Sequence, residues 1–159
     1  MPDMLVKLYE LPHDAHNATP HDKDIVIRPA MAPDKVRILE WVRTHTGVAA
    51  AGECDVCFSH TPISCFIATK GKDIVGYACY NATALNFFGP TKVLECEQGK
   101  GIGKALLLRS LFAMAQQGYA YAVIGGVGPQ DFYEKAVGAT LIPNSTPGIY
   151  KNFIGGMKD

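Results

Sequence analysis

The stretch that decides the fold is Gln98-Gly-Lys-Gly-Ile-Gly103, followed directly by Lys104-Ala-Leu-Leu-Leu-Arg-Ser-Leu-Phe-Ala-Met-Ala115. Apolar residues at 102, 105, 106, 108, 111, 112 and 114 recur at helical spacing, which predicts a long helix ending near Gly118. The glycines in front of it carry no side chains, so backbone N–H groups can face a bound anion. The helix N-terminus adds about half a positive charge. The loop therefore predicts a binding site for a phosphate or pyrophosphate.

Two other kinds of phosphate loop do not match this stretch. A Walker loop needs Gly-x4-Gly-Lys-Ser/Thr, which the sequence lacks. A dinucleotide-binding loop needs Gly-x-Gly-x-x-Gly early in a strand-helix-strand unit, whereas this loop is late in the chain and reads Gly-x-Gly-x-Gly.

Working outward from the loop, the patterning predicts a mixed α/β (α+β) fold with parallel and antiparallel strands. Gly89-Pro90 interrupts one predicted strand, which indicates an edge or a bulge at that point. Pro33 and Pro129 begin two further predicted helices, and a small-residue stretch up to Asp55 predicts another short one. The predicted strands are 25–28, 64–69, 74–80, 86–93, 119–124, 139–142 and 149–154.

Residues 1–23 differ from the rest of the chain. Leu5–Tyr9 alternates weakly, and the polar stretch after Pro12 carries His13, His16 and His21. The histidine spacings lack helical support for a metal site, so we expect a solvated loop there. We expect residues 1–23 to form an N-terminal arm or an added strand, and residues 24–159 to form a single domain.

Composition narrows the function classes. The chain has 159 residues, 48% of them apolar, and its 15 basic and 15 acidic residues cancel. Zero net charge argues against a dedicated nucleic-acid binder. No run approaches the eighteen or so apolar residues of a membrane span, and the first residues lack the features of a signal peptide. We therefore expect a cytoplasmic protein with no nucleic-acid or membrane partner.

The cysteines fit a reducing compartment. Five are present, at irregular spacing, which is a poor disulfide framework. Cys54-x-x-Cys57 is half of a zinc-site signature, but neither a second pair nor His-x3-His follows it. Free, half-buried thiols are the favoured interpretation and a metal or redox role is the alternative, so the sequence predicts no metal.

The glycine loop resembles the acetyl-coenzyme A signature of the GNAT superfamily of N-acetyltransferases, Gln/Arg-x-x-Gly-x-Gly/Ala. Gln98, Gly101 and Gly103 meet it. Three further stretches resemble conserved regions of that superfamily, namely 25–30, 74–78 and 132–139. The resemblance covers roughly residues 24–153. It implies a GNAT-like mixed central sheet flanked by helices and splayed between the strands near 86–95 and 119–124.

The resemblance implies acetyl-coenzyme A as the donor substrate. Its pyrophosphate would lie on the amides of residues 100–104, and its pantetheine arm would pair with the backbone around 94–96 like an added strand. Whether Lys100 and Lys104 also reach the phosphates or are simply solvated is left open. The implied cofactor-binding residues are Leu94, Glu95, Cys96, Gln98, Gly99, Lys100, Gly101, Ile102, Gly103, Lys104, Phe132 and Tyr133.

The implied reaction is direct attack of a neutral amine on the thioester in a ternary complex. A backbone N–H of Leu94 or its neighbour would stabilise the oxyanion. Tyr133 would be the general acid that protonates the departing thiolate, because a phenol with a pKa near 10 stays protonated at neutral pH. The alternative role for Tyr133 is packing against the cofactor.

The acceptor side is less defined. Glu95 and Glu97 end the strand before the loop, where we expect them to be solvated beside the phosphates. Glu53, Asp55 and His60 are candidates for binding or deprotonating the amine. Glycines at 125, 126 and 128 suit close approach of a ligand. The substrate-binding residues predicted are Asp55, His60, Phe88 and Gly126, with Trp41, Cys57, Phe58 and Phe87 as further candidates for the pocket wall.

The sequence thus predicts an acetyltransferase acting on a primary amine, with a small molecule as the expected acceptor. The alternative is a GNAT-fold protein that senses acyl-coenzyme A or a metabolite without turnover. The N-terminal arm or an exposed sheet edge could also pair two copies, so a homodimer is compatible with the sequence.

Overall fold

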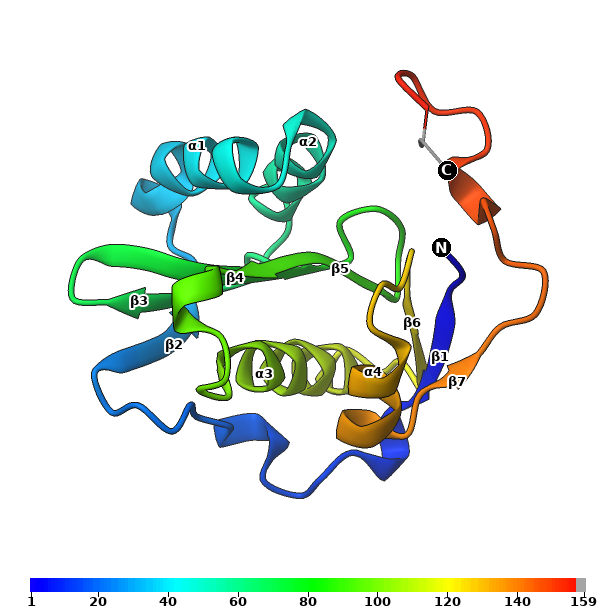
Figure 1. The fold of residues 1–159 in the computed structure, drawn as a ribbon, viewed down its shortest axis with the longest axis horizontal. Helices are drawn as coiled ribbons and strands as arrows, with labels where there is room; N and C mark the ends of the chain where they lie inside the picture. Colours follow the sequence, from blue (N-terminus) through cyan, green and yellow to red (C-terminus); the bar gives the residue numbers. More distant parts are fainter. Residues whose placement is uncertain (157–159) are drawn as a thin grey trace.

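The computed structural model describes residues 1–156, so the last three residues of the expected domain 24–159 lie outside the described part. Helices lie on both faces of a seven-stranded sheet (Figure 1). This confirms the predicted mixed α/β fold. The strands, in the spatial order β2-β3-β4-β5-β6-β1-β7, are Ile25–Pro29, Cys65–Lys70, Asp73–Tyr80, Phe87–Val93, Tyr121–Ile124, Met4–Lys7 and Thr140–Leu141.

Four α-helices cover the sheet. The helices α1 (Lys35–His45) and α2 (Val48–Cys57) lie on one face, and α3 (Ile102–Gln116) and α4 (Gln130–Val137) lie on the other (Figure 1). Each of the four begins within a few residues of its predicted position. Gly138, at φ +65°, ends α4 in the left-handed conformation that glycine adopts without strain.

The sheet splays at β5 and β6, which are the parallel pair among the strands of residues 1–156. β5 and β6 pair at Phe87–Val123 and Phe88–Ile124, while β5 continues to Val93. β4 and β5 change register between Ala78 and Tyr80, opposite Gly89-Pro90. Of the two expectations for that dipeptide, the bulge is confirmed and the edge is wrong, because β5 has neighbours on both sides.

The N-terminal segment contributes the strand β1 to the sheet and then contacts α3. β1 pairs with β6 on one side and β7 on the other, both antiparallel, and Met4 and Val6 are buried. The chain then passes along α3, where Arg109 Nε donates a hydrogen bond to the Ala18 carbonyl at 2.9 Å. Figure 1 shows this blue segment beneath α3.

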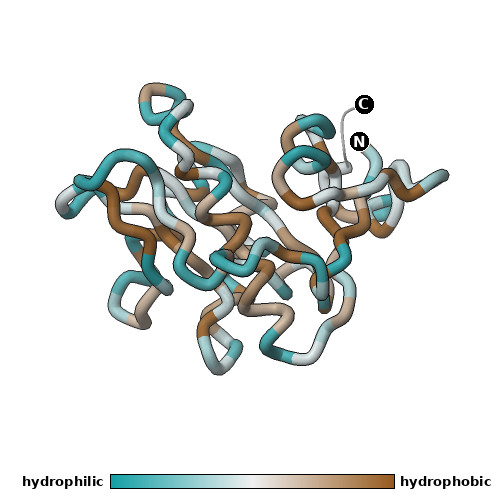
Figure 2. The backbone as a smooth tube through the Cα atoms, turned by 90° about the horizontal axis from the view of Figure 1, so that it is seen from below, coloured by the Kyte–Doolittle hydropathy of each residue, from teal (hydrophilic) through white to brown (hydrophobic). Residues whose placement is uncertain are grey.

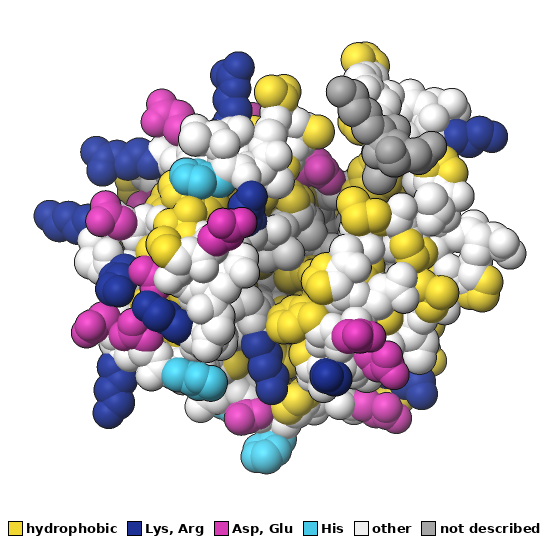
Figure 3. Space-filling model, viewed as in Figure 1, with side chains coloured by type: hydrophobic (Ala, Val, Ile, Leu, Met, Phe, Trp, Pro, Cys, Tyr) yellow, Lys and Arg dark blue, Asp and Glu magenta, His cyan; other side chains and the backbone are white. Residues whose placement is uncertain are grey.

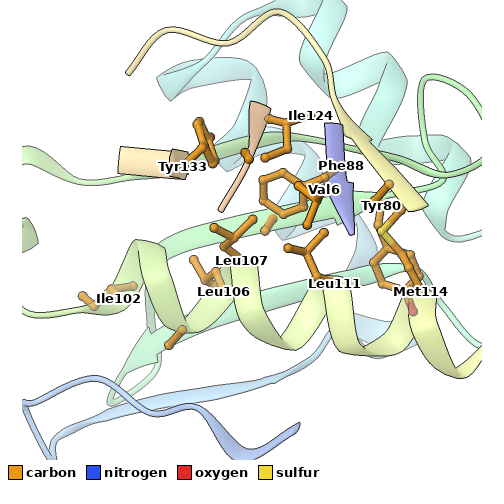
Figure 4. Close-up of a cluster of buried hydrophobic side chains, with 14 of the residues drawn as sticks. Val6, Tyr80, Phe88, Ile102, Leu106, Leu107, Leu111, Met114, Ile124 and Tyr133 are labelled. Atoms are coloured by element: carbon orange, nitrogen blue, oxygen red, sulfur yellow. The ribbon is translucent and has the colours of Figure 1, made fainter. Parts of the chain in front are cut away.

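Two hydrophobic cores lie on opposite faces of the sheet. The larger packs Leu106, Leu107, Leu111 and Met114 of α3 against the strands, with Phe88 among them (Figure 4). The smaller lies under α1 and α2 and includes Ile38, Val42 and four cysteines. Figure 2 shows that the hydrophobic stretches of the chain run through the body of the molecule while the loops are mainly hydrophilic.

One predicted strand is wrong. Residues 149–154 were expected to be extended, but Gly148–Tyr150 is a short 3-10 helix and Ile154 is 99% exposed. The preceding expected strand, 139–142, shortens to Thr140–Leu141. β7 pairs with β1 over these two residues only, and the chain after it turns away from the sheet. Among residues 1–156, none of the helices has the length and apolar character needed to cross a bilayer.

Candidate functional site

A cleft of about 590 Å³ opens where β5 and β6 diverge. Three segments form its walls: the second half of β5, the glycine loop with the start of α3, and the start of α4. Figure 3 shows a hollow near the middle of the molecule, with hydrophobic side chains along one side. The lining residues are Phe88, Thr91, Lys92, Val93, Glu97, Gln98, Gly99, Gly101, Ile102, Gly103, Lys104, Leu107, Pro129, Phe132 and Tyr133.

The glycine loop presents backbone donors to this cleft. Gly99 and Gly101 have φ of +83° and +82°, a conformation that side chains disfavour, and α3 begins directly after them. The first N–H groups of a helix have no intrahelical acceptor, so those of Ile102, Gly103 and Lys104 remain available for an anion. The Gln98 amide donates to the Val93 carbonyl at 3.3 Å, which ties the loop to β5.

The two lysines of the loop differ in their surroundings. Lys100 Nζ lies 2.6 Å from Glu97 and 3.4 Å from Asp22, and Lys70 joins the same carboxylates. The Glu97 carboxylate beside it raises the pKa of Lys100, and Lys100 in turn lowers the pKa of Glu97. Lys100 is therefore engaged with carboxylates and does not line the cleft. Lys104 lines it and is exposed.

Leu94 does not offer a free backbone donor. Its N–H donates to the Val75 carbonyl at 3.0 Å inside the sheet. Along antiparallel strands, residue pairs joined by backbone hydrogen bonds alternate with pairs that are not. Leu94 and Val75 form a hydrogen-bonded pair, so the adjacent pair, Val93 and Gly76, is not hydrogen-bonded. The Val93 N–H therefore points away from β4, toward the splayed side. Of Leu94 and its neighbour Val93, therefore, only Val93 has an N–H that β4 does not use.

Leu94, Glu95 and Cys96 lie outside the cleft lining. Glu95–Glu97 form a 3-10 turn, which carries the chain away from β5 before it returns at the glycine loop. Cys96 is exposed. The extended backbone that a pantetheine arm could pair with is accordingly three residues earlier than expected, at Thr91–Val93.

Tyr133 reaches the cleft from α4. Its side chain is only 7% exposed, and burial raises the pKa of its phenol above the usual value of 10. Figure 4 shows it near Phe88 and Ile124, at the point where β5 and β6 part. Phe132 stands beside it with ring centroids 5.0 Å apart. Tyr133 thus brings a protonated, largely buried phenol to the wall of the cleft.

The predicted acceptor residues do not gather at one place. Phe88 lines the cleft. Asp55 instead forms a 3.0 Å ion pair with Lys35 on the outer surface of α2 and α1. The His60 ring is bonded to the Asn81 carbonyl at 3.0 Å, and the Gly126 N–H donates to Asp3 at 2.9 Å. Trp41, Cys57 and Phe58 belong to the core beneath α1 and α2.

A polar group that includes one of the candidate bases lies at the start of β5. Glu53 of α2 accepts a hydrogen bond from Thr83 of the β4–β5 loop, and Tyr150 of the C-terminal tail lies 3.5 Å from the same carboxylate. Burial, with the nearby Glu53 and Asp3 charges, raises the pKa of Tyr150. Of these three residues only Glu53 is a candidate from the sequence. Thr83 and Tyr150 stand in no recognisable motif, and no sequence pattern indicates that the tail folds back onto α2.

Gly125 joins this polar group to the end of β6. A Cβ there would meet the Phe87 ring at 3.0 Å, so any larger residue would require the ring to shift, and the Tyr150 hydroxyl would lie in contact at 3.7 Å. The neighbours of Gly125 are thus side chains of the protein itself, Phe87 and Tyr150, while Gly126 and Gly128 have open space where a Cβ would be.

Comparison with known proteins yields structural similarity without sequence similarity. No family model matches the chain, and no curated protein does. A GCN5-related N-acetyltransferase from Sphaerobacter thermophilus matches with a TM-score of 0.63 at 19% identity, over 89% of this chain and 48% of that one. The N-acetyltransferase region of a fungal multi-domain β-N-acetylglucosaminidase matches with 0.68 at 10% identity, over 89% and 19%.

A third match is closer in length. A GNAT family acetyltransferase from Brucella melitensis, solved in complex with acetyl-CoA, matches with a TM-score of 0.54 at 17% identity, over 77% of this chain and 88% of that one. The chain spans about half or less of the first matching structures. At these identities the matches show the fold, and that fold is the one shared by GNAT N-acetyltransferases.

Proposed function

We propose that this chain, which has the fold of GNAT N-acetyltransferases, transfers an acetyl group from acetyl-coenzyme A to a primary amine. The observation that carries the proposal is the cleft between the diverging strands β5 and β6, which is lined by both the start of α3 and Tyr133. An anion-binding helix start on one side and a buried proton donor on the other suit a phosphorylated thioester.

The donor would bind with its pyrophosphate on the N–H groups of Ile102, Gly103 and Lys104. Its pantetheine arm would run along Thr91–Val93, whose outward backbone groups are not used by β4. This binding places the thioester carbonyl near the Val93 N–H and its sulfur near Tyr133.

The reaction then follows from these positions. The amine nitrogen forms a bond to the acetyl carbon, and the Val93 N–H stabilises the oxyanion of the tetrahedral intermediate. When the carbon–sulfur bond breaks, Tyr133 donates its proton to the thiolate. The amine loses its own proton to a base, for which we propose Glu53, directly or through water.

Glu53 suits that role because of the groups that surround its carboxylate. The carboxylates at the cleft itself are poor bases for an amine: Glu97, the acidic residue in the lining, is paired with two lysines. Glu53 is held by hydroxyl groups of Thr83 and Tyr150, with no cationic side chain among its contacts in residues 1–156. A carboxylate held only by hydroxyls can attract a protonated amine and take up a proton.

The test is release of free thiol from acetyl-coenzyme A in the presence of a panel of primary amines. We expect turnover with at least one small amine, and we expect Glu53→Gln to lower kcat/KM by at least about tenfold while acetyl-coenzyme A binding is retained. Glu40→Gln, at an exposed position of α1, is the matched control. Tight binding of acetyl-coenzyme A without thiol release for any amine would instead favour the sensing protein.

A further inference from the structure

Four of the five cysteines converge in the core beneath α2. Cys54 and Cys57 lie one helical turn apart on α2, Cys65 is the first residue of β3, and Cys79 is on β4. All four are buried, whereas Cys96 is exposed. The second cysteine pair that a zinc signature requires is missing from the sequence next to Cys54-x-x-Cys57, but the β3–β4 hairpin supplies it in space.

The pairing of β3 with β4 brings two of these thiols together. Cys65 lies directly opposite Cys79. Tyr80 N–H bonds to the Ser64 carbonyl, so Cys65 and Cys79 form a non-hydrogen-bonded pair, in which side chains stand closest. Their side chains point to the face that α2 covers.

The helix completes the cluster. The sulfur atoms of Cys54, Cys65 and Cys79 all lie within 4.8 Å of one another, and Cys57, one helical turn after Cys54, is buried in the same core cluster. We propose that Cys54, Cys57, Cys65 and Cys79 form a structural zinc site that joins α2 to the β3–β4 hairpin. This site is separate from the acetyl-coenzyme A cleft and does not depend on the proposed activity.

The spacing of the sulfurs favours one ion over a cluster. A tetrahedron of Zn–S bonds of about 2.3 Å places its sulfurs about 3.8 Å apart, and the sulfurs of Cys54, Cys65 and Cys79 lie within 4.8 Å of one another. A four-iron cluster holds its thiolates farther apart than this. Soft thiolate ligands in tetrahedral number favour zinc among the common divalent ions.

Binding needs no oxidant. Each coordinating thiol gives its S–H proton to solvent and its sulfur lone pair to the ion, so no electrons are transferred and the affinity rises with pH. Because the thiols are buried, the ion enters as the chain folds. The site would then hold the second half of α2 in place, and Glu53 lies there, one residue before Cys54.

The test measures metal directly. The full chain, expressed with added zinc, is expected to contain one zinc per chain by elemental analysis. Cobalt(II) added during refolding is expected to give the visible bands of a tetrahedral ion with an intense thiolate charge-transfer band. Cys65→Ser is expected to lose most of the bound metal, whereas Cys96→Ser, outside the cluster, keeps it.

Three results would overturn the site. One is a folded wild-type chain with no more zinc than a chelator-treated sample and no cobalt charge-transfer band. Another is a metal-free chain whose mass is lower by two hydrogens, which identifies a disulfide. The third is equal metal retention in Cys65→Ser and Cys96→Ser. If Cys65→Ser does not fold, cobalt titration of the refolding wild type decides the question alone.

Discussion

Tyr133 is the residue on which the proposed chemistry depends most. Its hydroxyl is buried in the cleft wall, and burial raises its pKa, so the phenol is protonated throughout the neutral range. As an acid it functions below its pKa and loses function as the pH rises through it. Alkaline loss of activity below about pH 10 should therefore have another cause.

We predict that Tyr133→Phe lowers kcat by about 10²-fold or more and leaves acetyl-coenzyme A affinity nearly unchanged, because only the proton donor is removed. Steady-state thiol release and calorimetric binding measure the two quantities. Tyr9→Phe is the control, since Tyr9 is 61% exposed and outside the cleft lining. Equal activity in Tyr133→Phe and wild type would leave Tyr133 with a packing role.

The lysines of the glycine loop give a second prediction at this scale. Lys104→Ala should weaken acetyl-coenzyme A binding several-fold and reduce its dependence on salt, because Lys104 lines the cleft and is exposed. Lys100→Ala should leave binding nearly unchanged, because Lys100 is already paired with Glu97 and Asp22. Titrations of the two variants with acetyl-coenzyme A at two salt concentrations measure these effects. A larger loss of affinity in Lys100→Ala than in Lys104→Ala would contradict the assignment of Lys104 to the phosphates.

The site residues could be predicted from the sequence only where a local motif carries them. Gln98, Gly101, Gly103 and Tyr133 stand in such motifs and all line the cleft. The sequence left the backbone donor at Leu94 or its neighbour, because strand register, which the sequence does not reveal, decides which N–H is free. Tyr150 was missed because its role depends on where the tail folds back.

At the scale of elements, α3 connects the core to the site. Leu106, Leu107 and Leu111 are fully buried under the sheet, and the same helix presents its N-terminus to the cleft. Burial of that apolar face fixes the direction in which the first N–H groups point. The stability of α3 and the shape of the anion site are thereby coupled.

We predict that Leu111→Ala lowers the free energy of unfolding by about 2–5 kcal/mol, because it leaves a cavity in a packed core. Leu85→Ala, at a 65% exposed position, should change it by no more than about 0.5 kcal/mol. Urea unfolding followed by circular dichroism measures both. Similar values for the two variants would mean that α3 does not pack as described.

The elements were largely predictable because hydrophobic spacing and proline or glycine boundaries are local signals. All four helices and six of the seven predicted strands occur near their predicted places. Residues 149–154 failed because a strand needs a partner edge as well as apolar residues. Among the described residues, the edge beyond β6 is taken by β1, from the other end of the chain.

At the scale of the whole molecule, residues 1–23 contact both the central sheet and the glycine loop. β1 lies between β6 and β7, and the His21 N–H donates to the Lys100 carbonyl at 2.8 Å. The His21 ring also lies against Gly101. We infer that residues 1–23 belong to the same folding unit as the cleft and support the back of the glycine loop.

We predict that a chain starting at residue 24 fails to fold cooperatively. Met4, Val6 and Leu8 are buried. Burying each of these side chains stabilises the fold by about 1.5–3 kcal/mol, so losing all three would remove a large part of the usual net stability of about 5–15 kcal/mol. His21→Ala should fold normally. Thermal unfolding of the truncated chain and of His21→Ala compares the two proteins. A sharp unfolding transition in the truncated chain would show that residues 1–23 are an independent arm.

The central claim is that the cleft binds acetyl-coenzyme A through the start of α3, and calorimetric titration tests it most directly. Gly103→Glu is the informative variant: a side chain there faces Val93 and Phe132 at 3.8 and 4.0 Å, and an acidic residue in the first turn suits the helix dipole. The fold should survive while the carboxylate repels the pyrophosphate. Gly103→Ala is the small control.

We expect wild type to bind one acetyl-coenzyme A per chain, Gly103→Ala to bind nearly as well, and Gly103→Glu to lose at least about tenfold in affinity, or 1.4 kcal/mol. Failure of folded wild type to bind acetyl-coenzyme A would contradict the account. Equal binding by Gly103→Glu would also contradict it, because the phosphates would then lie elsewhere.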